Sequence, residues 1–303
     1  MHRHRQQERD VLIGLAEALA KSGVSKLLLH AWERRYGMEP AERSPSGRRF
    51  YTREQVERLR LLKSCSDGGY RIGALVSLST ETLVRLEMEM EARQGLPEII
   101  EAVQAMDSDR LEALLRVRAE RDPPEHFIRA TALPLMREIG SMWAAGKVSI
   151  AAEHMTTAQI KRILGGLFDR CPPPASDAPR LVATTPEREE HDIGALVATL
   201  LARLRGWNAL FLGANMPAAE IADAARRRSV HCVCLSSLTG RKATLERHLR
   251  ELRSALSPDI EIWIGGAAYR TVSTMGGISF MSNLDSFMDA LSDSGRRYLS
   301  LAG

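Results

Sequence analysis

The spacing of apolar residues divides this 303-residue chain into three regions. Residues 16–20 form a short predicted helix, residues 22–24 a turn, and Ser25 is placed to cap a second helix that runs to about Tyr36. Between residues 96 and 170, apolar side chains recur at helical intervals and predict a bundle of about four helices. Beyond residue 180, short apolar strands alternate with helices, which predicts a doubly wound parallel sheet.

The predicted elements of this last region follow one another at regular intervals. Strands are expected at residues 181–185, 209–213, 231–236, 261–264 and 277–281, and helices near residues 191–205, 217–228, 242–256 and 284–293. Ligands of such sheets bind beyond the carboxyl ends of the strands, so the residues that follow each strand are the first candidates for a site.

A basic ribbon follows the second predicted helix. Residues 43–51 read Arg-Ser-Pro-Ser-Gly-Arg-Arg-Phe-Tyr, and the central proline and glycine predict a turn between two short strands, as in the wing of a DNA-binding domain. Residues 1–80 carry 15 Lys and Arg against 9 Asp and Glu, although the net charge of the whole chain is only +4. This concentration of positive charge favours an anionic partner for the amino-terminal region.

Basic residues of the second helix and the ribbon are candidates for contact with DNA. Lys26 and His30 lie in the amino half of the helix, where side chains reach base edges in the major groove. The arginines of the ribbon suit phosphates or the minor groove, whereas Trp32 and Phe50 are expected in the core. The full set of candidates is Lys26, His30, Arg34, Arg35, Arg43, Arg48, Arg49 and Tyr51.

Residues 11–78 resemble the winged helix-turn-helix of the MerR family. The resemblance is carried by Trp-Glu-Arg-Arg-Tyr-Gly at 32–37 and by Gly-Arg-Arg at 47–49 followed by Tyr51. It implies binding to promoter or operator DNA. MerR dimers use a long helix after the winged domain, whereas residues 81–94 are followed by Gly95 and Pro97, which are expected to interrupt that helix. We therefore expect another domain to form the oligomer.

The run Glu189-Glu190-His191-Asp192-Ile193-Gly194 follows the first predicted strand of the sheet. Glu189 can accept a hydrogen bond from one imidazole nitrogen of His191, which leaves the other nitrogen for a metal ion. Gly194 has no side chain to block the approach of a flat macrocycle. A small hydroxyl side chain and two glycines, in Ser236-Ser237-Leu238 and Gly265-Gly266, follow two further strands, where ordinary turn chemistry is the simpler alternative.

In order and spacing, these three motifs resemble the cobalamin-binding domain of corrinoid proteins, with Glu189 in place of the more common Asp. The resemblance implies that His191 is the lower axial ligand of cobalt. It also implies that the benzimidazole tail of the cofactor is buried beside Ser236 and Gly265-Gly266, and that Leu238 and Gly194 belong to the same cofactor site.

The helical region contains a further motif, in which Trp143 is followed by nine residues and then by Glu153-His154, with Gly146 breaking the helix between them. Ile150 lies three and four residues before this pair and is expected on the same helix face. The motif resembles the helical cap of the CarH and LitR family of cobalamin-dependent photoreceptor repressors, whose domain order matches nearly the whole chain.

That resemblance implies three domains. Residues 1–80 form an all-α winged helix-turn-helix, and residues 81–172 form a four-helix bundle. Residues 178–303 form an α/β doubly wound, flavodoxin-like cobalamin-binding domain. It implies that Trp143, Ile150, Glu153 and His154 enclose the adenosyl face of adenosylcobalamin. It further implies a tetramer or dimer of dimers on DNA in the dark that becomes smaller in light. The chain departs from some members at Ala144, where they carry a His that binds cobalt after illumination. No enzymatic turnover is expected.

Three alternatives remain open. The first is a light-independent cobalamin sensor, and the second is a sensor that binds haem through His191 and His154. The third is a corrinoid methyl-transfer module, for which the amino-terminal domain is unexpected. The four cysteines form no metal or disulfide pattern and fit a reducing cytosol, with the protein associated with the nucleoid. No signal peptide and no membrane contact are expected.

Overall fold

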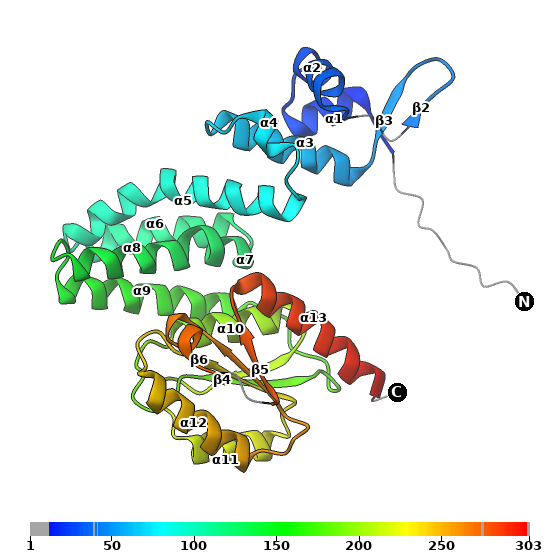
Figure 1. The fold of residues 1–303 in the computed structure, drawn as a ribbon. Coiled ribbons are helices and arrows are strands. Elements are labelled where there is room, and N and C mark those ends of the chain that lie inside the picture. The colour runs from blue at the N-terminus through cyan, green and yellow to red at the C-terminus, as the bar shows by residue number, and fades with distance from the viewer. Residues whose placement is uncertain (1–11, 39, 41, 274–275, 302–303) are drawn as a thin grey trace, which may run out of the picture. The chain divides into compact units, whose positions relative to one another are not determined.

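The computed structural model describes residues 12–38, 40, 42–273 and 276–301. Contacts divide the chain into two compact units, Met1–Glu101 with Arg129–Arg137 and Ala102–Ile128 with Glu138–Gly303. Each unit contains its own cluster of buried apolar side chains. Figure 1 shows their elements along the chain. Among the described residues, no helix combines the length and apolar character that crossing a membrane requires.

The first unit begins with the predicted helix-turn-helix. Helix α1 (Leu15–Ser22) ends at Gly23, and α2 (Lys26–Tyr36) begins after Ser25, whose side chain accepts a hydrogen bond from the Leu28 N–H at 3.2 Å. Strands β2 (Glu42–Arg43) and β3 (Arg49–Tyr51) pair antiparallel and form the predicted wing. A third strand, β1 (Ile13–Gly14), pairs with the other edge of β3 and has no clear sequence signal because it is only two residues long.

Three helices complete the first unit and lead out of it. They are α3 (Arg53–Asp67), α4 (Ile72–Leu75) and α5 (Thr80–Gln104). The expected interruption near Gly95 and Pro97 is wrong, because α5 continues through both residues. Burial of Leu96 and Ile99 on the same helix offsets the hydrogen bond that a proline removes.

The amino half of α5 packs on the winged domain. Leu83 is fully buried in the same apolar cluster as Trp32, and Met90 packs against that cluster. Arg60 of α3 also forms an ion pair with Glu87 of α5, with 2.8 Å between Nη1 and Oε1. Leu83 and Met90 of α5 therefore belong to the core of the winged domain.

The middle of the chain is helical, as predicted. After α5 come α6 (Ser108–Arg121), α7 (Pro124–Phe127), a π-helical turn η1 (Ile128–Ala132), α8 (Leu133–Ala144) and α9 (Ile150–Asp169). Gly146, with φ +70°, lies in the break between α8 and α9, and Ser149 caps α9. In the second unit, α6 packs against α9, and α9 packs against the first helix of the sheet domain.

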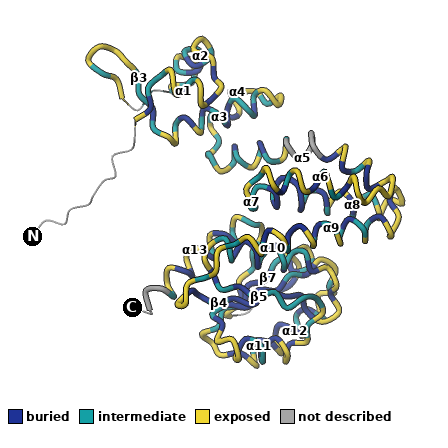
Figure 2. The backbone as a smooth tube through the Cα atoms, turned by 180° about the vertical axis from the view of Figure 1, so that it is seen from behind, coloured by how far each residue is buried: buried dark blue, intermediate teal, exposed yellow. Residues whose placement is uncertain are grey.

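The carboxyl-terminal region is the predicted doubly wound sheet. Its strands are β4 (Arg180–Thr184), β5 (Asn208–Phe211), β6 (Cys232–Ser236), β7 (Glu261–Gly265) and β8 (Ile278–Met281). They are all parallel in the order β5-β4-β6-β7-β8, which is the flavodoxin-like order. The strands are mostly buried, as the dark central part of Figure 2 shows.

Helices cover both faces of this sheet. Helices α10 (Ile193–Leu204) and α13 (Leu284–Leu301) contact each other, and α11 (Ala218–Arg228) packs against α12 (Lys242–Ala255) on the opposite side (Figure 1). A short 3-10 helix, η2 (Ala267–Thr271), follows β7.

Helix α13 is longer than predicted. The sequence analysis expected a helix near residues 284–293, and residues 294 and 295 are Ser and Gly, which favour helices weakly. Instead, Ser294 is buried and donates a hydrogen bond to Glu261, and Gly295 lies so close to Trp207 that a Cβ atom would be 3.4 Å from the indole nitrogen. Packing on residues distant in sequence therefore outweighs the weak local helix propensity.

Candidate functional site

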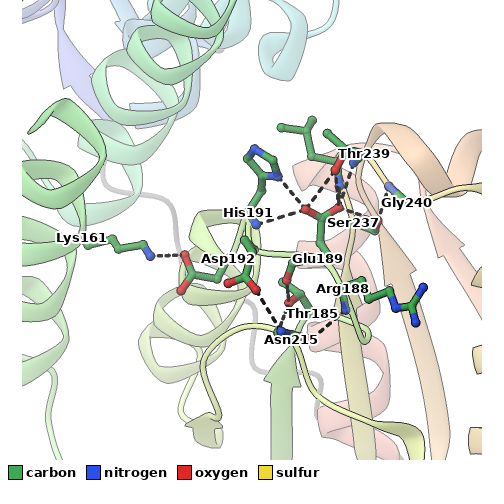
Figure 3. A network of polar contacts seen from close by, with 12 residues as sticks. Lys161, Thr185, Arg188, Glu189, His191, Asp192, Asn215, Ser237, Thr239 and Gly240 are labelled. Carbon is green, nitrogen blue, oxygen red and sulfur yellow. Dashed lines mark hydrogen bonds and ion pairs between the residues drawn. The ribbon is translucent and has the colours of Figure 1, made fainter. Parts of the chain in front are cut away.

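The segment between β4 and α10 places Glu189 and His191 next to each other. Glu189 is buried, with 1% of its side chain exposed, and its Oε1 lies 2.6 Å from Nδ1 of His191. The His191 backbone N–H donates to the same oxygen at 3.1 Å. The side chain of His191 is 53% exposed, and Figure 3 shows its ring joined to the Glu189 carboxylate.

The second oxygen of Glu189 is held by the turn after β6. Ser237 Oγ and the backbone N–H groups of Leu238 and Thr239 each donate to Oε2 at 2.8 Å. Burial by itself raises the pKa of Glu189, but the hydrogen bonds from Thr239, His191 and Ser237 outweigh it and lower the pKa to about 2. Glu189 is therefore ionised at neutral pH, and the Ser237 hydroxyl and the backbone N–H groups of His191, Leu238 and Thr239 that donate to it are neutral.

This arrangement determines what His191 can do. A charged carboxylate at Nδ1 favours the tautomer with the proton on that nitrogen, which leaves Nε2 with its lone pair. Among the described residues, none hydrogen-bonds to Nε2. The Glu189–His191 hydrogen bond is the one that the sequence predicted, whereas the binding of a metal ion by Nε2 stays a prediction.

The loop that carries Glu189 is fixed by residues that the sequence analysis missed. Asn215, in the turn after β5, donates its backbone N–H to Thr185 Oγ1 at 2.8 Å, and its side-chain oxygen accepts from the Arg188 N–H at 2.7 Å (Figure 3). Thr185 in turn donates to the Glu189 carbonyl. Asn215 and Thr239 both follow predicted strands, which was the signal that could have identified them.

Gly194 and Gly266 both lie close to the end of β6 and the turn that follows it. A Cβ atom on Gly194 would lie 2.3 Å from Ser236 Oγ, so the glycine brings the start of α10 close to that hydroxyl. Gly266 has φ +101°, and a Cβ atom there would lie 2.2 Å from the Ser237 carbonyl oxygen. The missing side chain of Gly266 is thus required by the fold itself, while Gly265 makes only ordinary contacts with Met281.

Two features of this region fit a bound ligand with an apolar body and polar groups. The hydroxyl of Tyr269 is buried and has no hydrogen-bond partner among the described residues, and burial followed by the charge of Glu189 raises its pKa. Leu238, in contrast, is apolar and 53% exposed. Together with the Gly194 and Ser236 contact and the single nitrogen of His191, these residues have the chemistry that a corrinoid with a nucleotide tail requires.

The helical motif lies on both sides of the break between α8 and α9. Trp143 is 50% exposed and Ile150 58% exposed, which is unusual for large apolar side chains. Glu153 accepts a hydrogen bond from Thr157 at 2.8 Å, and its other oxygen is 3.6 Å from Nδ1 of the exposed His154. Among the described residues, no hydrogen bond or ion pair joins these four side chains to His191, so their role as a cap remains a prediction.

A different contact links the helical segment to the His191 loop. Lys161 of α9 forms an ion pair with Asp192, with 2.6 Å between Nζ and Oδ1 (Figure 3). Asp192 is buried and directly follows His191 in sequence, at the start of α10. This ion pair joins α9 to the residue that follows His191.

In the first unit, the predicted DNA-binding residues separate into two groups. The exposed group consists of Lys26, Arg34, Arg35, Arg43 and Arg48. His30 is partly buried, and its Nε2 atom is buried without a partner in the described part of the chain. Trp32 is buried, which confirms that it belongs to the core.

Arg49 and Tyr51 form the second group, because both contact Glu33 of α2. Arg49 Nη1 lies 2.9 Å from Glu33 Oε2, and the buried Tyr51 hydroxyl donates to Glu33 Oε1 at 2.9 Å. Burial, followed by the Glu33 carboxylate, raises the pKa of Tyr51 to about 12. These contacts join the wing to the second helix of the helix-turn-helix, and the assignment of Arg49 and Tyr51 to DNA stays a prediction.

Family models match three segments of the chain. A model described as "MerR HTH family regulatory protein" matches residues 15–80, and two models described as "B12 binding domain" match residues 96–167 and 179–277. These matches support cobalamin and give no support to haem. The monomethylamine corrinoid protein of Methanosarcina barkeri, with a TM-score of 0.50 and 18% identity, covers 66% of this chain and 99% of its own, which shows a shared fold.

Two relatives extend the similarity across the winged domain. The HTH-type transcriptional repressor CarA of Myxococcus xanthus is 28% identical over 73% of this chain and 74% of its own length. The HTH-type transcriptional repressor CarH of the same organism is 32% identical over 87% of this chain and 91% of its own length. The chain belongs to the family of CarH-like, B12-binding HTH-type transcriptional repressors with a MerR-type DNA-binding domain.

Proposed function

We propose that this repressor uses adenosylcobalamin as a light-sensitive cofactor and that its state of assembly controls its affinity for promoter DNA. The observation that carries the proposal is the combination, within one unit, of an oriented imidazole at His191 with exposed Trp143 and Ile150. The sequence resemblance to CarH and LitR photoreceptors assigns these residues to the lower and upper faces of the cofactor.

The chain would hold the cofactor through residues of both regions of the second unit. His191 would bind cobalt through Nε2 while Glu189 holds its Nδ1. Ser236, Leu238, Gly265, Gly266 and the Tyr269 hydroxyl would lie beside the nucleotide tail, with Gly194 at the start of α10. Trp143, Ile150, Glu153 and His154 would cover the adenosyl group. When bound, adenosylcobalamin supplies a cobalt–carbon bond that light breaks.

The exposed apolar residues of the cap provide the physical basis of the switch. Covering apolar surface stabilises a bound state by about 25 cal/mol per Å², so a group packed on Trp143 and Ile150 fixes the arrangement of α8 and α9. When that group leaves, both side chains return to solvent and the arrangement is no longer stabilised. The Lys161–Asp192 ion pair connects the same helix, α9, to the His191 loop.

Assembly would then determine DNA binding. A tetramer, or dimer of dimers, brings several winged domains to neighbouring DNA sites, and linking weak binders raises their combined affinity by orders of magnitude. Dissociation in light would leave each domain with only its own basic residues. The proposed domains remain residues 1–80 for DNA, 81–172 for the cap and 178–303 for the base of the cofactor site.

A light-independent cobalamin sensor is the second candidate function, and Ala144 favours it. Ala144 is the last residue of α8 and directly follows Trp143. Its methyl group offers no ligand for cobalt, so the illuminated form cannot be stabilised by a second histidine at this position. A response to the presence or chemical state of cobalamin would need no such ligand.

Size-exclusion chromatography with mass determination tests the proposal. The full chain is loaded with adenosylcobalamin and measured in the dark and after illumination, together with its affinity for a duplex that the same chain has enriched from random DNA. We expect a larger, tighter-binding species in the dark for the wild type. Trp143→Ala should reduce the dark assembly, whereas Val117→Ala, which changes an exposed apolar residue on α6, should not. Equal mass and equal DNA affinity in dark and light would refute light sensing and favour the second candidate.

A further inference from the structure

The second helix of the helix-turn-helix carries one large apolar side chain that no part of its unit covers. Leu27 is 83% exposed, more than any other of the large hydrophobic side chains identified as exposed in the described part of the chain. It is the second residue of α2, directly after Ser25 and Lys26. Its two neighbours along the helix behave in the usual way, since Leu28 is partly buried and Leu29 is fully buried.

The geometry of α2 explains why Leu27 cannot join the core. At about 100° per residue, the buried side chains of Leu29 and Trp32 lie roughly 200° and 140° around the helix from Leu27. Leu27 therefore points almost directly away from the core of the winged domain. The outward face centred on it includes Ala31 and Arg34 at helical spacing.

Charge identifies the occupant of this face as a polyanion. Lys26, Arg34 and Arg35 are exposed on the same helix, and Arg48 is exposed at the tip of the wing. The amino end of a helix also carries a partial positive charge, and side chains of the first turn of such a helix contact base edges when it lies in the major groove. Ala31 is small, so it leaves room for a groove wall to approach the helix closely.

We propose that Leu27 is a base-reading residue that packs against the 5-methyl group of thymine in the DNA site. Thymine is the base that presents an apolar group in the major groove, and apolar side chains are its usual partners. The basic residues around Leu27 supply affinity for phosphates without selecting a sequence. The proposal rests on the DNA binding of this repressor and is independent of light sensing.

The expected effect follows from the size of one methyl group. Burial of a single carbon contributes about 0.8 kcal/mol, which corresponds to a change of about fourfold in affinity for each methyl group contacted. Leu27→Ala should therefore lower the affinity for DNA that contains thymine by at least about fourfold. It should not change the affinity for DNA that lacks the thymine methyl groups.

The experiment uses the full chain loaded with adenosylcobalamin, once in the dark and once in light. A duplex enriched by this chain from random DNA is synthesised in two forms, one with thymine and one with deoxyuridine at every thymine position. We expect the wild type to bind the deoxyuridine form about fourfold more weakly for each contacted methyl group. Leu27→Ala should bind both forms equally, and Leu12→Ala, a change of another exposed leucine of this unit, should behave as the wild type.

Three results would overturn the assignment. The wild type could bind both forms equally, Leu27→Ala could discriminate between them as strongly as the wild type, or the chain could enrich no duplex at all. Equal behaviour in dark and light, with discrimination intact, would refute the proposed photoreceptor function and leave the role of Leu27 supported.

Discussion

Two glutamates organise the two functional regions, and different groups balance their charges. Glu33, in the DNA-binding unit, is paired with the guanidinium of Arg49 and with the Tyr51 hydroxyl. Glu189, in the cobalamin unit, receives hydrogen bonds from a hydroxyl, two backbone N–H groups of the β6 turn and His191. The first carboxylate is neutralised by a cation, whereas the second keeps its charge for the imidazole.

The difference fits the task of each region. The wing needs a fixed angle to α2, and an ion pair that is largely shielded from solvent joins two elements without leaving a net charge between them. In the proposed role of His191 as a cobalt ligand, its imidazole must be polarised, which a carboxylate whose other donors are neutral groups provides. Each of the following predictions tests one side of this comparison.

The largest effect is expected for Glu189→Ala. It leaves the Ser237 hydroxyl and the Leu238 and Thr239 N–H groups without their acceptor, and each unsatisfied buried donor costs about 1–3 kcal/mol. Cobalamin affinity should fall by about 10–100-fold as well, because the orientation of His191 is lost. Thermal unfolding of the cobalamin-free chain and a spectroscopic cobalamin titration measure the two effects. Glu189→Asp, which keeps the carboxylate, is the control and should retain most of both.

His191→Ala should separate binding from folding. The substitution removes the imidazole hydrogen bond to Glu189 but leaves the carboxylate its donors on Ser237, Leu238 and Thr239. We therefore expect the free energy of unfolding of the cobalamin-free chain to fall by only about 1 kcal/mol. Cobalamin should bind at least tenfold more weakly or keep its own base on cobalt, which the absorption spectrum reports. Unchanged affinity together with an unchanged spectrum would remove His191 from the site.

The charge of Glu189 predicts a pH dependence. Its pKa is lowered from its usual value of 4.5 to about 2 in the folded chain, so its contribution to stability is fully present above about pH 4.5 and is lost as the pH falls toward 2. The difference in melting temperature between the wild type and Glu189→Gln, both without cobalamin, should therefore narrow below about pH 4.5. A difference that stays constant from pH 6 to pH 3.5 would contradict the ionised, hydrogen-bonded carboxylate.

On the DNA side, the two neighbouring arginines of the wing should differ. Arg48 is exposed, so Arg48→Ala should weaken binding to all sequences and reduce the slope of log affinity against log salt by about 0.9 for one lost phosphate contact. Arg49 pairs with Glu33, so Arg49→Ala should lower the stability of the winged domain by about 1 kcal/mol. Salt titrations of DNA binding and thermal unfolding measure these effects. If Arg49→Ala changes the salt slope and leaves unfolding unaltered, Arg49 contacts phosphate after all.

The smallest effect is expected at the upper face of the cofactor. Ala144→His places an imidazole directly after Trp143. The illuminated, cobalamin-bound variant should then show a bis-histidine cobalt spectrum that resists added cyanide. The wild type should exchange its upper ligand readily. DNA affinity in the dark should be the same for both proteins, because Ala144 is exposed at the end of α8 and supports no core contact.

Local sequence was sufficient wherever one short segment determines its own structure. The Ser25 cap, the wing turn at Gly47 and the alternation of strands and helices after residue 180 are visible in the sequence because capping, positive φ and apolar periodicity act over a few residues. The Glu189 and His191 pair belongs to this class, since two positions of a single loop bring the atoms to 2.6 Å.

Tertiary structure decided what depends on segments far apart in sequence. The groups that donate to Glu189 Oε2 belong to Ser237, Leu238 and Thr239, about fifty residues further along the chain, and Arg49 reaches Glu33 across the wing. Helix α5 passes through Pro97, and α13 extends past Gly295, because side chains packed from elsewhere outweigh local propensity. The sequence alone therefore determined which elements form and which residues have the right chemistry. Only packing decided where the helices end and which charged side chains are paired with one another. Both depend on contacts between residues far apart in sequence, which no local pattern specifies.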